Sequence, residues 1–265
     1  MIRFATNLTM MFTEHPLAER FAAAKAAGFA AVECQQPYEL PAAEIARILK
    51  KTGQPMLLIN TPPGNAAAGE RGLGCLVGRE ADFEAAFART MDYVRTLGVK
   101  YVHVMAGVPA TTTDPSISDQ VFLRNLKGAL AHSAGSGVTL LVEPLNHRDF
   151  PGYHLTKFAH ARRLIDAVGD ERLQLQLDLY NRQISEGDLE RALREYIDIA
   201  PHIQIAGAPG RNEPDVGEIN YAHLFRVIDE IGYKGWVGCE YRPLGGTVAG
   251  LGWREKLAPQ AVAGL

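Results

Sequence analysis

The sequence predicts a single-domain α/β protein that folds as a closed (β/α)8 barrel. Two observations lead to this prediction. Eight short β-rich segments alternate with helical segments, and eight such units in 265 residues match the usual size of one barrel. The apolar fraction of 47% and the charged fraction of 22% are those of an ordinary globular domain with a substantial core. We therefore expect residues 1–265 to form one domain.

The β-rich segments are expected to be parallel, because each is followed by a helical pattern that returns the chain to the same edge of the sheet. A doubly wound open sheet is the alternative. It is disfavoured because no glycine-rich dinucleotide turn follows the first segment, and the glycines at 69–74 open no helix directly. The strands of the predicted TIM barrel are residues 2–6, 31–34, 56–60, 101–105, 139–143, 173–178, 202–206 and 236–240.

Residues typical of helix ends bound several of the segments between strands. Pro41 stands in the first turn of the helix after the second strand, Ile45 and Leu49 lie on its apolar face, and Gly53 ends it. The same reasoning gives three further pairs of helix ends, which are Ser118 and Gly135, Thr156 and Gly169, and Asn220 and Gly232.

One connection is unusually long for a compact barrel. Residues 61–79 separate the third strand from its helix and are rich in Gly, Ala and Pro. Structureless connections of this length in compact domains are usually functional lids or disordered segments. We expect a lid that covers a substrate at the mouth of the barrel, with an insertion of no function as the alternative.

Composition and charge exclude several classes of protein. The net charge is −3 and no run of Lys or Arg exceeds two residues, so the basic footprint of a nucleic-acid-binding protein is missing. Three cysteines stand far apart without a CxxC pair, which indicates free thiols in a reducing compartment. The N-terminal residues do not resemble a signal peptide, and no stretch approaches the roughly 18 apolar residues of a membrane span. We expect a cytoplasmic enzyme or binding protein without nucleic-acid or membrane partners.

Strand alternation places polar side chains inside the predicted barrel. In residues 173–178, leucine alternates with two glutamines and Asp178, and the leucines must face the surrounding helices. The same alternation turns His202 and Gln204 inward in the seventh strand. Barrel interiors are usually packed with branched apolar side chains, so inward polar groups need hydrogen bonds or a ligand. His103 and His202 are interpreted as hydrogen-bonded interior residues rather than ligands.

The last four strands each deliver one oxygen-bearing side chain at the carboxyl end. These are Glu143, Asp178, Gln204 and Glu240, and their separations of 35, 26 and 36 residues correspond to one β/α unit each. They should converge at the mouth, where barrel enzymes do their chemistry. Two carboxylates about 4 Å apart repel by on the order of 4 kcal/mol at an effective dielectric near 20, so protonation or a bound cation must relieve the site. An all-oxygen ligand set suits Mg²⁺ or Mn²⁺ better than Zn²⁺.

Six segments of the chain carry recognisable motifs: residues 7–14 (NLTMMFTE), 68–75 (AGERGLGC), 142–146 (VEPLN), 209–214 (PGRNEP), 217–220 (GEIN) and 235–243 (GWVGCEYRP). Together they resemble the hydroxypyruvate isomerase family, which includes 2-oxo-tetronate isomerases and lies within the xylose-isomerase-like barrel superfamily. The resemblance implies a divalent metal, Mg²⁺ or Mn²⁺, held by Glu143, Asp178, Gln204 and Glu240. It also implies that Glu143 and Glu240 are the catalytic acid–base pair, and that Arg211 holds the polar end of the substrate.

The activity that the resemblance implies is an aldose–ketose type isomerisation of a small hydroxy-oxo acid through an enediolate. The expected substrates are hydroxypyruvate, which would give tartronate semialdehyde, or a 2-oxo-tetronate. Arg211, and after it Arg71, are the candidates to bind the substrate carboxylate. Asn181 departs from the family, whose members commonly carry a histidine there that reaches the substrate, so the substrate identity is open. A sugar 3-epimerase or polyol dehydratase with the same metal and glutamate pair is the alternative.

Two other classes fit the sequence less well. A metal-dependent endonuclease on this barrel would need several histidine ligands and a basic groove, but no two of the eight histidines are spaced HxH or HxxxH. A non-catalytic sugar-binding barrel is disfavoured by the intact pair of Glu143 and Glu240. A homo-oligomer is left open, and residues 261–265 are expected to form a loose tail.

Overall fold

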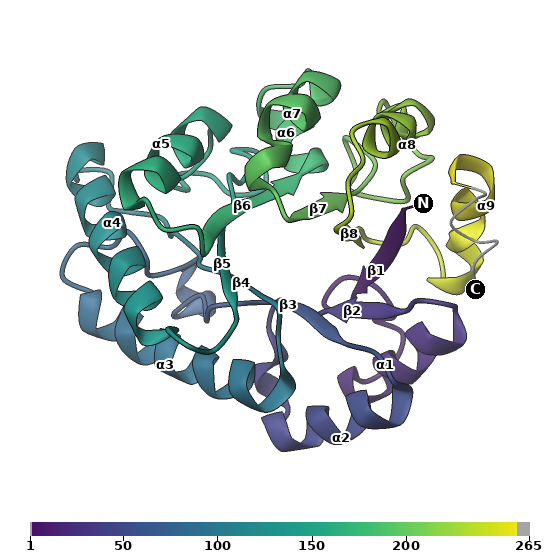
Figure 1. Ribbon diagram of the computed structural model, residues 1–265, viewed down its shortest axis with the longest axis horizontal. Helices are drawn as coiled ribbons and strands as arrows, with labels where there is room; N and C mark the ends of the chain where they lie inside the picture. The colour runs from purple at the N-terminus through teal and green to yellow at the C-terminus, as the bar shows by residue number, and fades with distance from the viewer. Residues whose placement is uncertain (1, 259–265) are drawn as a thin grey trace.

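The computed structural model describes residues 2–258 and confirms the closed barrel. The parallel strands lie side by side in chain order, and the last strand closes the ring by pairing with the first (Figure 1). The tail expected at 261–265 lies outside the described residues. The strands are β1 (Arg3–Asn7), β2 (Ala31–Glu33), β3 (Met56–Asn60), β4 (Tyr101–His103), β5 (Thr139–Val142), β6 (Leu173–Asp178), β7 (His202–Ile205) and β8 (Trp236–Cys239).

Helices form a ring outside the strands, and Figure 1 shows them around the barrel from α1 to α9. Short 3₁₀ turns interrupt the connections at Pro37–Glu39 (η1), Ala66–Ala68 (η2), Ile197–Ile199 (η3) and Val248–Gly252 (η4). The α-helices are α1 (Leu17–Ala26), α2 (Ala42–Thr52), α3 (Glu80–Leu97), α4 (Pro115–His132), α5 (Phe158–Val168), α6 (Leu179–Ser185), α7 (Leu189–Tyr196), α8 (Tyr221–Glu230) and α9 (Trp253–Leu257).

Several helix ends agree with the sequence prediction. Gly53 and Gly169 cap α2 and α5 in the left-handed conformation, with φ angles of 68° and 67°. The side chain of Asn220 caps α8 by accepting a hydrogen bond from an amide of its first turn. Gly135 and Gly232 lie in the turns after α4 and α8, also with positive φ.

The predicted helix start at Ser118 is wrong. α4 begins at Pro115, because the Asp114 side chain accepts a hydrogen bond from the amide two residues on (2.8 Å) and proline suits the first helical position. Ser118 is buried within α4. The start predicted at Thr156 is displaced as well, since α5 begins at Phe158.

The interior of the barrel changes from apolar to polar along its axis. Near the amino ends of the strands, a small apolar cluster fills the lumen, with Trp236 packed against it. The larger apolar core lies between the strands and the helices and includes the leucines of β6, which face outward from the barrel. The polar side chains therefore occupy the rest of the lumen, toward the carboxyl ends. The apolar cluster consists of Ala5, Ala31, Leu57, Leu58, Tyr101 and Leu141.

A fully buried carboxylate, Glu33 at the end of β2, forms the lower part of this polar region. Its oxygens accept hydrogen bonds from Gln204 (2.8 Å) and Asn7 (3.3 Å), and one lies 2.6 Å from His202 Nε2. The carboxylate fits only because Gly238, on β8, has no side chain to occupy the same space. One acidic residue thus joins three strands, β1, β2 and β7, inside the barrel.

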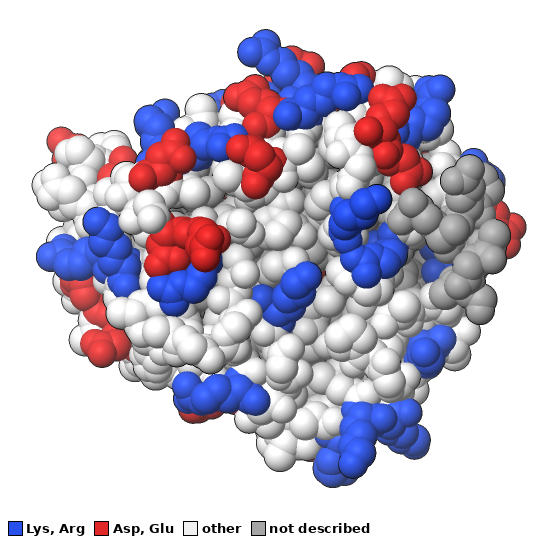
Figure 2. Space-filling view, in the orientation of Figure 1, with Lys and Arg blue, Asp and Glu red and all other residues white. Residues whose placement is uncertain are grey.

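The outer surface carries both signs of charge. On the face shown in Figure 2, Lys and Arg side chains are interspersed with Asp and Glu around the edge, and the centre is mostly uncharged. Among the described residues, no helix is both long enough and apolar enough to cross a membrane.

We predict that Gly238→Ala lowers the free energy of unfolding by about 1–3 kcal/mol, because the added Cβ would overlap the buried Glu33 carboxylate. Gly128→Ala is the matched control: a Cβ in that part of α4 meets no atom, and alanine should raise stability by about 0.5–1 kcal/mol. Urea unfolding followed by circular dichroism measures both variants. A Gly238→Ala midpoint equal to that of the wild type would show that Glu33 has room to move.

Candidate active site

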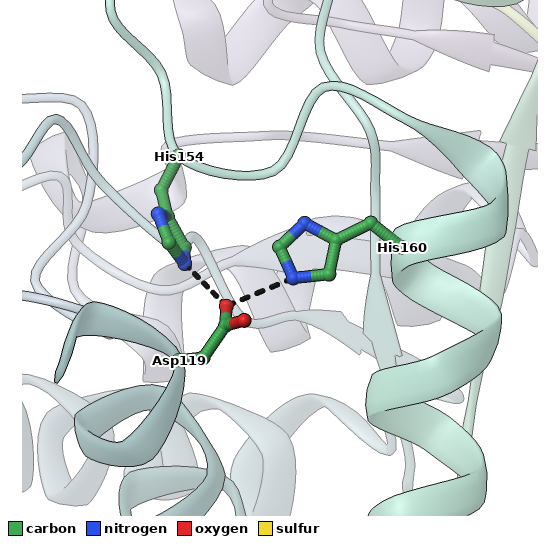
Figure 3. Close-up of side chains that lie close together, drawn as sticks. All are labelled: Asp119, His154 and His160. Atoms are coloured by element: carbon green, nitrogen blue, oxygen red, sulfur yellow. Dashed lines mark hydrogen bonds and ion pairs between the residues drawn. The ribbon is translucent and has the colours of Figure 1, made fainter. Parts of the chain in front are cut away.

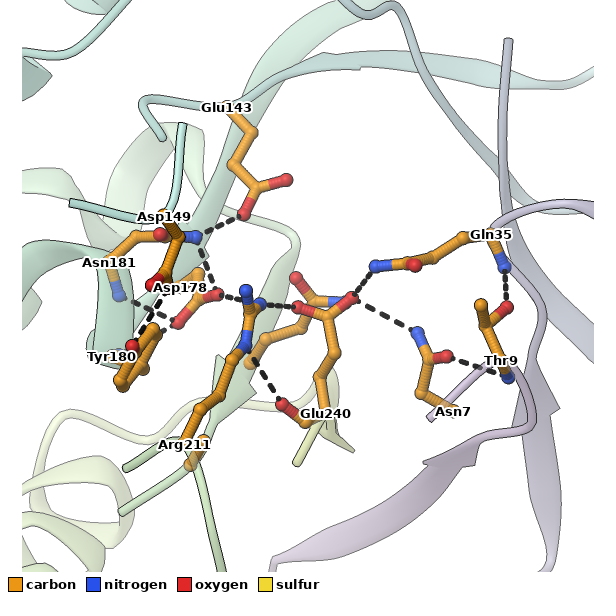
Figure 4. Close-up of polar contacts among 12 residues, drawn as sticks. Asn7, Thr9, Gln35, Glu143, Asp149, Asp178, Tyr180, Asn181, Arg211 and Glu240 are labelled. Atoms are coloured by element: carbon orange, nitrogen blue, oxygen red, sulfur yellow. Dashed lines mark hydrogen bonds and ion pairs between the residues drawn. The ribbon is translucent and has the colours of Figure 1, made fainter. Parts of the chain in front are cut away.

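Three carboxylates converge at the carboxyl end of the barrel. Glu143 follows β5, Asp178 ends β6 and Glu240 follows β8. All three are buried, and each offers one oxygen within 4.8 Å of the others (Figure 4). The structure therefore brings together three of the four residues that strand spacing placed at the mouth.

Gln204, the fourth residue of that set, lies deeper in the barrel. Its amide nitrogen donates to Glu33 (2.8 Å), and its oxygen accepts from Gln176 (2.5 Å). Gln176 also donates to Glu143 Oε2 (2.7 Å), so it links the deep glutamine to the carboxylates. The oxygen of Gln204 already accepts one hydrogen bond, which leaves its second lone pair for a cation.

Arg211 supplies the positive charge nearest to the carboxylates. Its Nη2 lies 3.1 Å from Asp178 Oδ2 and also contacts Glu240 Oε2. The guanidinium is buried and stacks over the Tyr180 ring, 4.9 Å from the centroid. The loop after β7 reaches this position with Arg211 in the left-handed conformation, at φ 57°. A non-glycine residue held at positive φ is strained, and functional sites are where such strain concentrates.

Asn181 lies behind the carboxylates rather than facing the cavity. Its Nδ2 donates to Glu143 Oε1 (2.9 Å) and to Asp178 Oδ2 (2.7 Å). Its Oδ1 accepts from both the backbone and the side chain of Asn146. The side chain is fully buried and saturated with partners, so the structure places it to orient two carboxylates.

The ionisation of the cluster is governed by burial. Burial raises the pKa of Glu240 to about 8, despite Arg211, which lowers it. Burial and the charges of Glu240 and Asp178 raise the pKa of Glu143 well above its ordinary range, and burial also raises the pKa of Asp178. For Arg211, burial opposes the charged form, but the surrounding carboxylates raise its pKa above the ordinary value.

Three residues that the sequence reasoning did not place at the site contact the two glutamates. Gln35 and Asn7 donate to Glu240 Oε1 at 2.5 and 3.1 Å. His103 Nδ1 lies 3.2 Å from Glu143 Oε2, and burial lowers the pKa of this imidazole to about 3. Each of the three lies at or just beyond the carboxyl end of its strand, so applying the strand-end criterion to β1, β2 and β4 would have found them.

A cavity of about 180 Å³ opens beside the carboxylates. Glu143, Glu240 and Arg211 line it, with Arg71 and His103. A larger hollow of about 380 Å³ lies on the outer helical layer, between α3 and α4, and contains none of the three carboxylates. The smaller cavity is therefore the one that fits chemistry at the barrel mouth.

Residues 61–79 form one wall of this cavity through Pro63, Ala66 and Arg71. The segment is well packed: Gly72 forms an antiparallel bridge with Ala106 after β4. At Gly72, any Cβ would overlap the backbone of the β4 loop. The long connection thus lies over the mouth, where main-chain contacts anchor it, and its role as a lid stays a prediction.

A model of the xylose isomerase-like TIM barrel matches residues 21–257. The chain belongs to this family. Two curated relatives are similar over nearly their full length: the 2-oxo-tetronate isomerase of Cupriavidus necator is 49% identical, with 96% of this chain and 97% of the relative covered. The hydroxypyruvate isomerase of Escherichia coli is 41% identical, with 96% and 99% covered. Relatives this similar identify the chain as an isomerase, as the motifs predicted.

Solved structures agree with the family assignment. A Brucella melitensis protein described as a family 2 AP endonuclease superposes with a TM-score of 0.94 at 42% identity, covering 97% of this chain and 99% of that one. The 3-keto-D-glucoside 4-epimerase of E. coli superposes with a TM-score of 0.82 at 20% identity, covering 97% and 100%. At that identity the epimerase shares the fold alone.

The raised pKa of Glu240 predicts that the metal-free protein loses stability as the pH rises. The carboxyl ionises near its ordinary value of 4.5 in the unfolded chain and at about 8 in the fold, so between these values the folded protein holds more protons. The Tm measured in chelator should therefore fall over this range. The fall in Tm should be smaller in Glu240→Gln. The fall that remains in this variant would come from the raised pKa values of Glu143 and Asp178. A wild-type Tm that rises over the same range would contradict the prediction.

Proposed function

We propose that this enzyme isomerises a small hydroxy-oxo acid, hydroxypyruvate or a 2-oxo-tetronate, by moving a proton between adjacent carbons. The observation that supports this most is the placement of two buried glutamates on one cavity with Arg211 and Arg71. Two carboxyl groups can take and return a proton, and an arginine can bind the carboxylate of the substrate through two parallel hydrogen bonds. The relatives named for these two substrates support the same choice.

The charge of the cavity lining supports an acid as the substrate. The cavity of about 180 Å³ adjoins a hollow of about 360 Å³ that shares Gln35, Phe150 and Arg211 with it, so its size alone sets no limit on the length of the substrate. The D-psicose 3-epimerase of Clostridium cellulolyticum, crystallised with a ketohexose, is only 16% identical to this chain. The arginines that line the cavity therefore favour the acid over the sugar that the alternative would require.

A divalent cation fits the carboxylate cluster. When all three buried carboxyls are ionised, as metal binding requires, they and the arginine in contact carry −3 + 1 = −2, which a divalent cation balances. We propose that Glu143, Asp178 and Glu240 hold Mg²⁺ or Mn²⁺, the ions that oxygen ligands prefer, with Gln204 as the expected fourth residue. When bound, such an ion polarises the carbonyl oxygen of a substrate and stabilises the charge that develops there.

The proton transfer is assigned to Glu143 and Glu240. One glutamate takes a proton from the carbon that bears the hydroxyl group, and the electron pair of that C–H bond forms the double bond of a cis-enediolate. A proton is then delivered to the neighbouring carbon, which was the carbonyl carbon, while the hydroxyl proton passes to the other oxygen. Burial raises the pKa of Glu240 to about 8 in the absence of a cation, and a bound cation would lower it, so that the ionised carboxylate could accept the proton.

The surrounding amides fix the direction of the two glutamates. Asn181 holds Glu143 from behind, and Gln35 and Asn7 hold Glu240 from the opposite side of the barrel (Figure 4). Positioned groups of this kind contribute to catalysis because they need no reorganisation in the transition state. Asn181 is therefore proposed as a positioning residue that acts on the substrate through Glu143.

The three cysteines of the chain are buried free thiols, Cys34, Cys75 and Cys239. Burial raises the pKa of each thiol, to about 11 for Cys34 and about 12 for Cys75. Unpaired thiols persist in a reducing compartment. We therefore propose that the enzyme works in the cytoplasm.

Proton NMR in D₂O with Mg²⁺ tests the proposed reaction. Hydroxypyruvate, a 2-oxo-tetronate and a ketohexose are supplied separately, and deuterium should enter the carbon-bound position of the acid product, because the glutamate exchanges its proton with solvent. Incorporation only into the ketohexose would favour the epimerase. Absence of exchange with all three substrates would overturn the proposed function.

Glu240→Gln should lower kcat by about 10²-fold or more, since an amide cannot accept the proton. Glu84→Gln, which alters an exposed residue on α3, is the matched control and should retain full activity.

Asp178→Asn distinguishes metal binding from proton transfer, because it removes a proposed metal ligand and leaves both glutamates of the acid–base pair in place. Its activity should recover in part at high Mg²⁺ or Mn²⁺, whereas that of Glu240→Gln should not. Full wild-type activity in excess EDTA would exclude the cation.

A further inference from the structure

A second cluster of ligand-type side chains lies outside the proposed active site. Asp119 on α4, His154 in the loop after β5 and His160 on the first turn of α5 point toward one another (Figure 3). The Nε2 atoms of the two imidazoles lie 2.7 and 2.8 Å from the same oxygen, Asp119 Oδ1. One nitrogen from each ring and one carboxylate oxygen all lie within 4.8 Å of one another.

We propose that Asp119, His154 and His160 bind a transition-metal ion of the Zn²⁺ class. Two imidazoles and one carboxylate are a recurrent protein ligand set for Zn²⁺ and its neighbours, which leaves further positions for water. Neither the motifs that resemble the family nor the proposed reaction involves these three residues. The inference therefore does not depend on the proposed function.

The geometry requires only a small adjustment to admit the ion. Ligands about 2.1 Å from a tetrahedral zinc are roughly 3.4 Å apart, so each imidazole would move by several tenths of an ångström from Asp119. In each ring, Nε2 would then bind the ion, and the single ring proton would sit on Nδ1. Both rings are neutral in this arrangement. Asp119 then contributes the one negative charge of the site.

Burial favours the form of histidine that binds metal. The side chains of His154 and His160 are 5% and 17% exposed, whereas that of Asp119 is 34% exposed and leaves an opening for the ion and its water. Burial lowers the pKa of His160, and the nearby His154 and Arg163 lower it further. Asp119 raises this pKa, but the net shift is downward. The imidazole is therefore neutral at physiological pH, so a proton does not compete with the cation.

The proposed ion would connect three separate parts of the barrel exterior. His154 is fixed to the β4 loop, because its amide donates to the Gly107 carbonyl (2.9 Å). The same connection after β5 carries Phe150, which lines the cavity, and Asn146, which holds Asn181. Joining this loop to α4 and α5 would stabilise the wall of the active site from behind. The expected role is thus structural, and its readout is stability as well as binding.

The experiment titrates Zn²⁺ into the full-length protein against a chromophoric chelator, with excess Mg²⁺ present to occupy the oxygen-ligand cluster. The variants are His160→Gln and Asp119→Asn. His223→Gln is the matched control, since His223 also pairs with a carboxylate, Glu190 at 2.6 Å, but without a second imidazole. Circular dichroism establishes that each variant is folded, and Tm is measured with and without Zn²⁺.

The wild type and His223→Gln should bind one more Zn²⁺ ion than His160→Gln, or should bind that ion at least about tenfold more tightly. Zn²⁺ should raise the Tm of the wild type and of His223→Gln, but not that of His160→Gln. Asp119→Asn should behave like His160→Gln. Cobalt added in place of zinc should give visible ligand-field absorption in the wild type that is lost in both variants. Equal Zn²⁺ stoichiometry and affinity in the wild type and the folded variants would overturn the proposal and leave a hydrogen-bonded triad.

Discussion

The mouth of this barrel is organised around the burial of three carboxylates in one place. Removing a charge from water is costly, and three like charges within a few ångströms of one another add repulsion to that cost. Arg211 meets two of the carboxylates directly, and five amide or imidazole side chains approach from the other directions. The residual negative charge that these partners leave when the carboxyls are ionised supports the proposal that the cluster binds a cation and transfers protons.

The same constraint extends down the lumen. The Gln176 amide nitrogen donates to both Glu143 and Gln204, and Gln204 donates to Glu33, so amides connect the upper carboxylates to the deep one. Gln204 uses both its acceptor and its donor in this connection, which adds no charge to the lumen. Below Glu33 the lumen becomes apolar and closes. The polar column is therefore supported by a packed base, which gives the carboxylates of the proposed site a rigid foundation.

The sequence allowed the barrel and most of the site to be predicted, because both depend on regular repeats. Alternating side chains in β6 and the spacing of strand ends were sufficient to bring Glu143, Asp178 and Glu240 together. The sequence could not supply the contacts that depend on a partner on another strand. The oxygen of Gln204 faces Gln176, and Asn181 donates to the carboxylates; no local pattern in the sequence reveals either contact. The pattern around Ser118 resembles a helix N-cap, but the Asp114–Pro115 pair just before it is the signal that begins α4.

The anchoring of residues 61–79 bears on how enzymes of this kind diversify. Gly72 and Gly107 bring two loop backbones so close that neither tolerates a Cβ, so the wall of the cavity is attached by its main chain. The side chains that face the cavity from this wall, Pro63, Ala66 and Arg71, take no part in that attachment through Gly72 and Gly107. Evolution or a protein engineer can therefore exchange them to accept a new substrate while the scaffold that presents them stays in place.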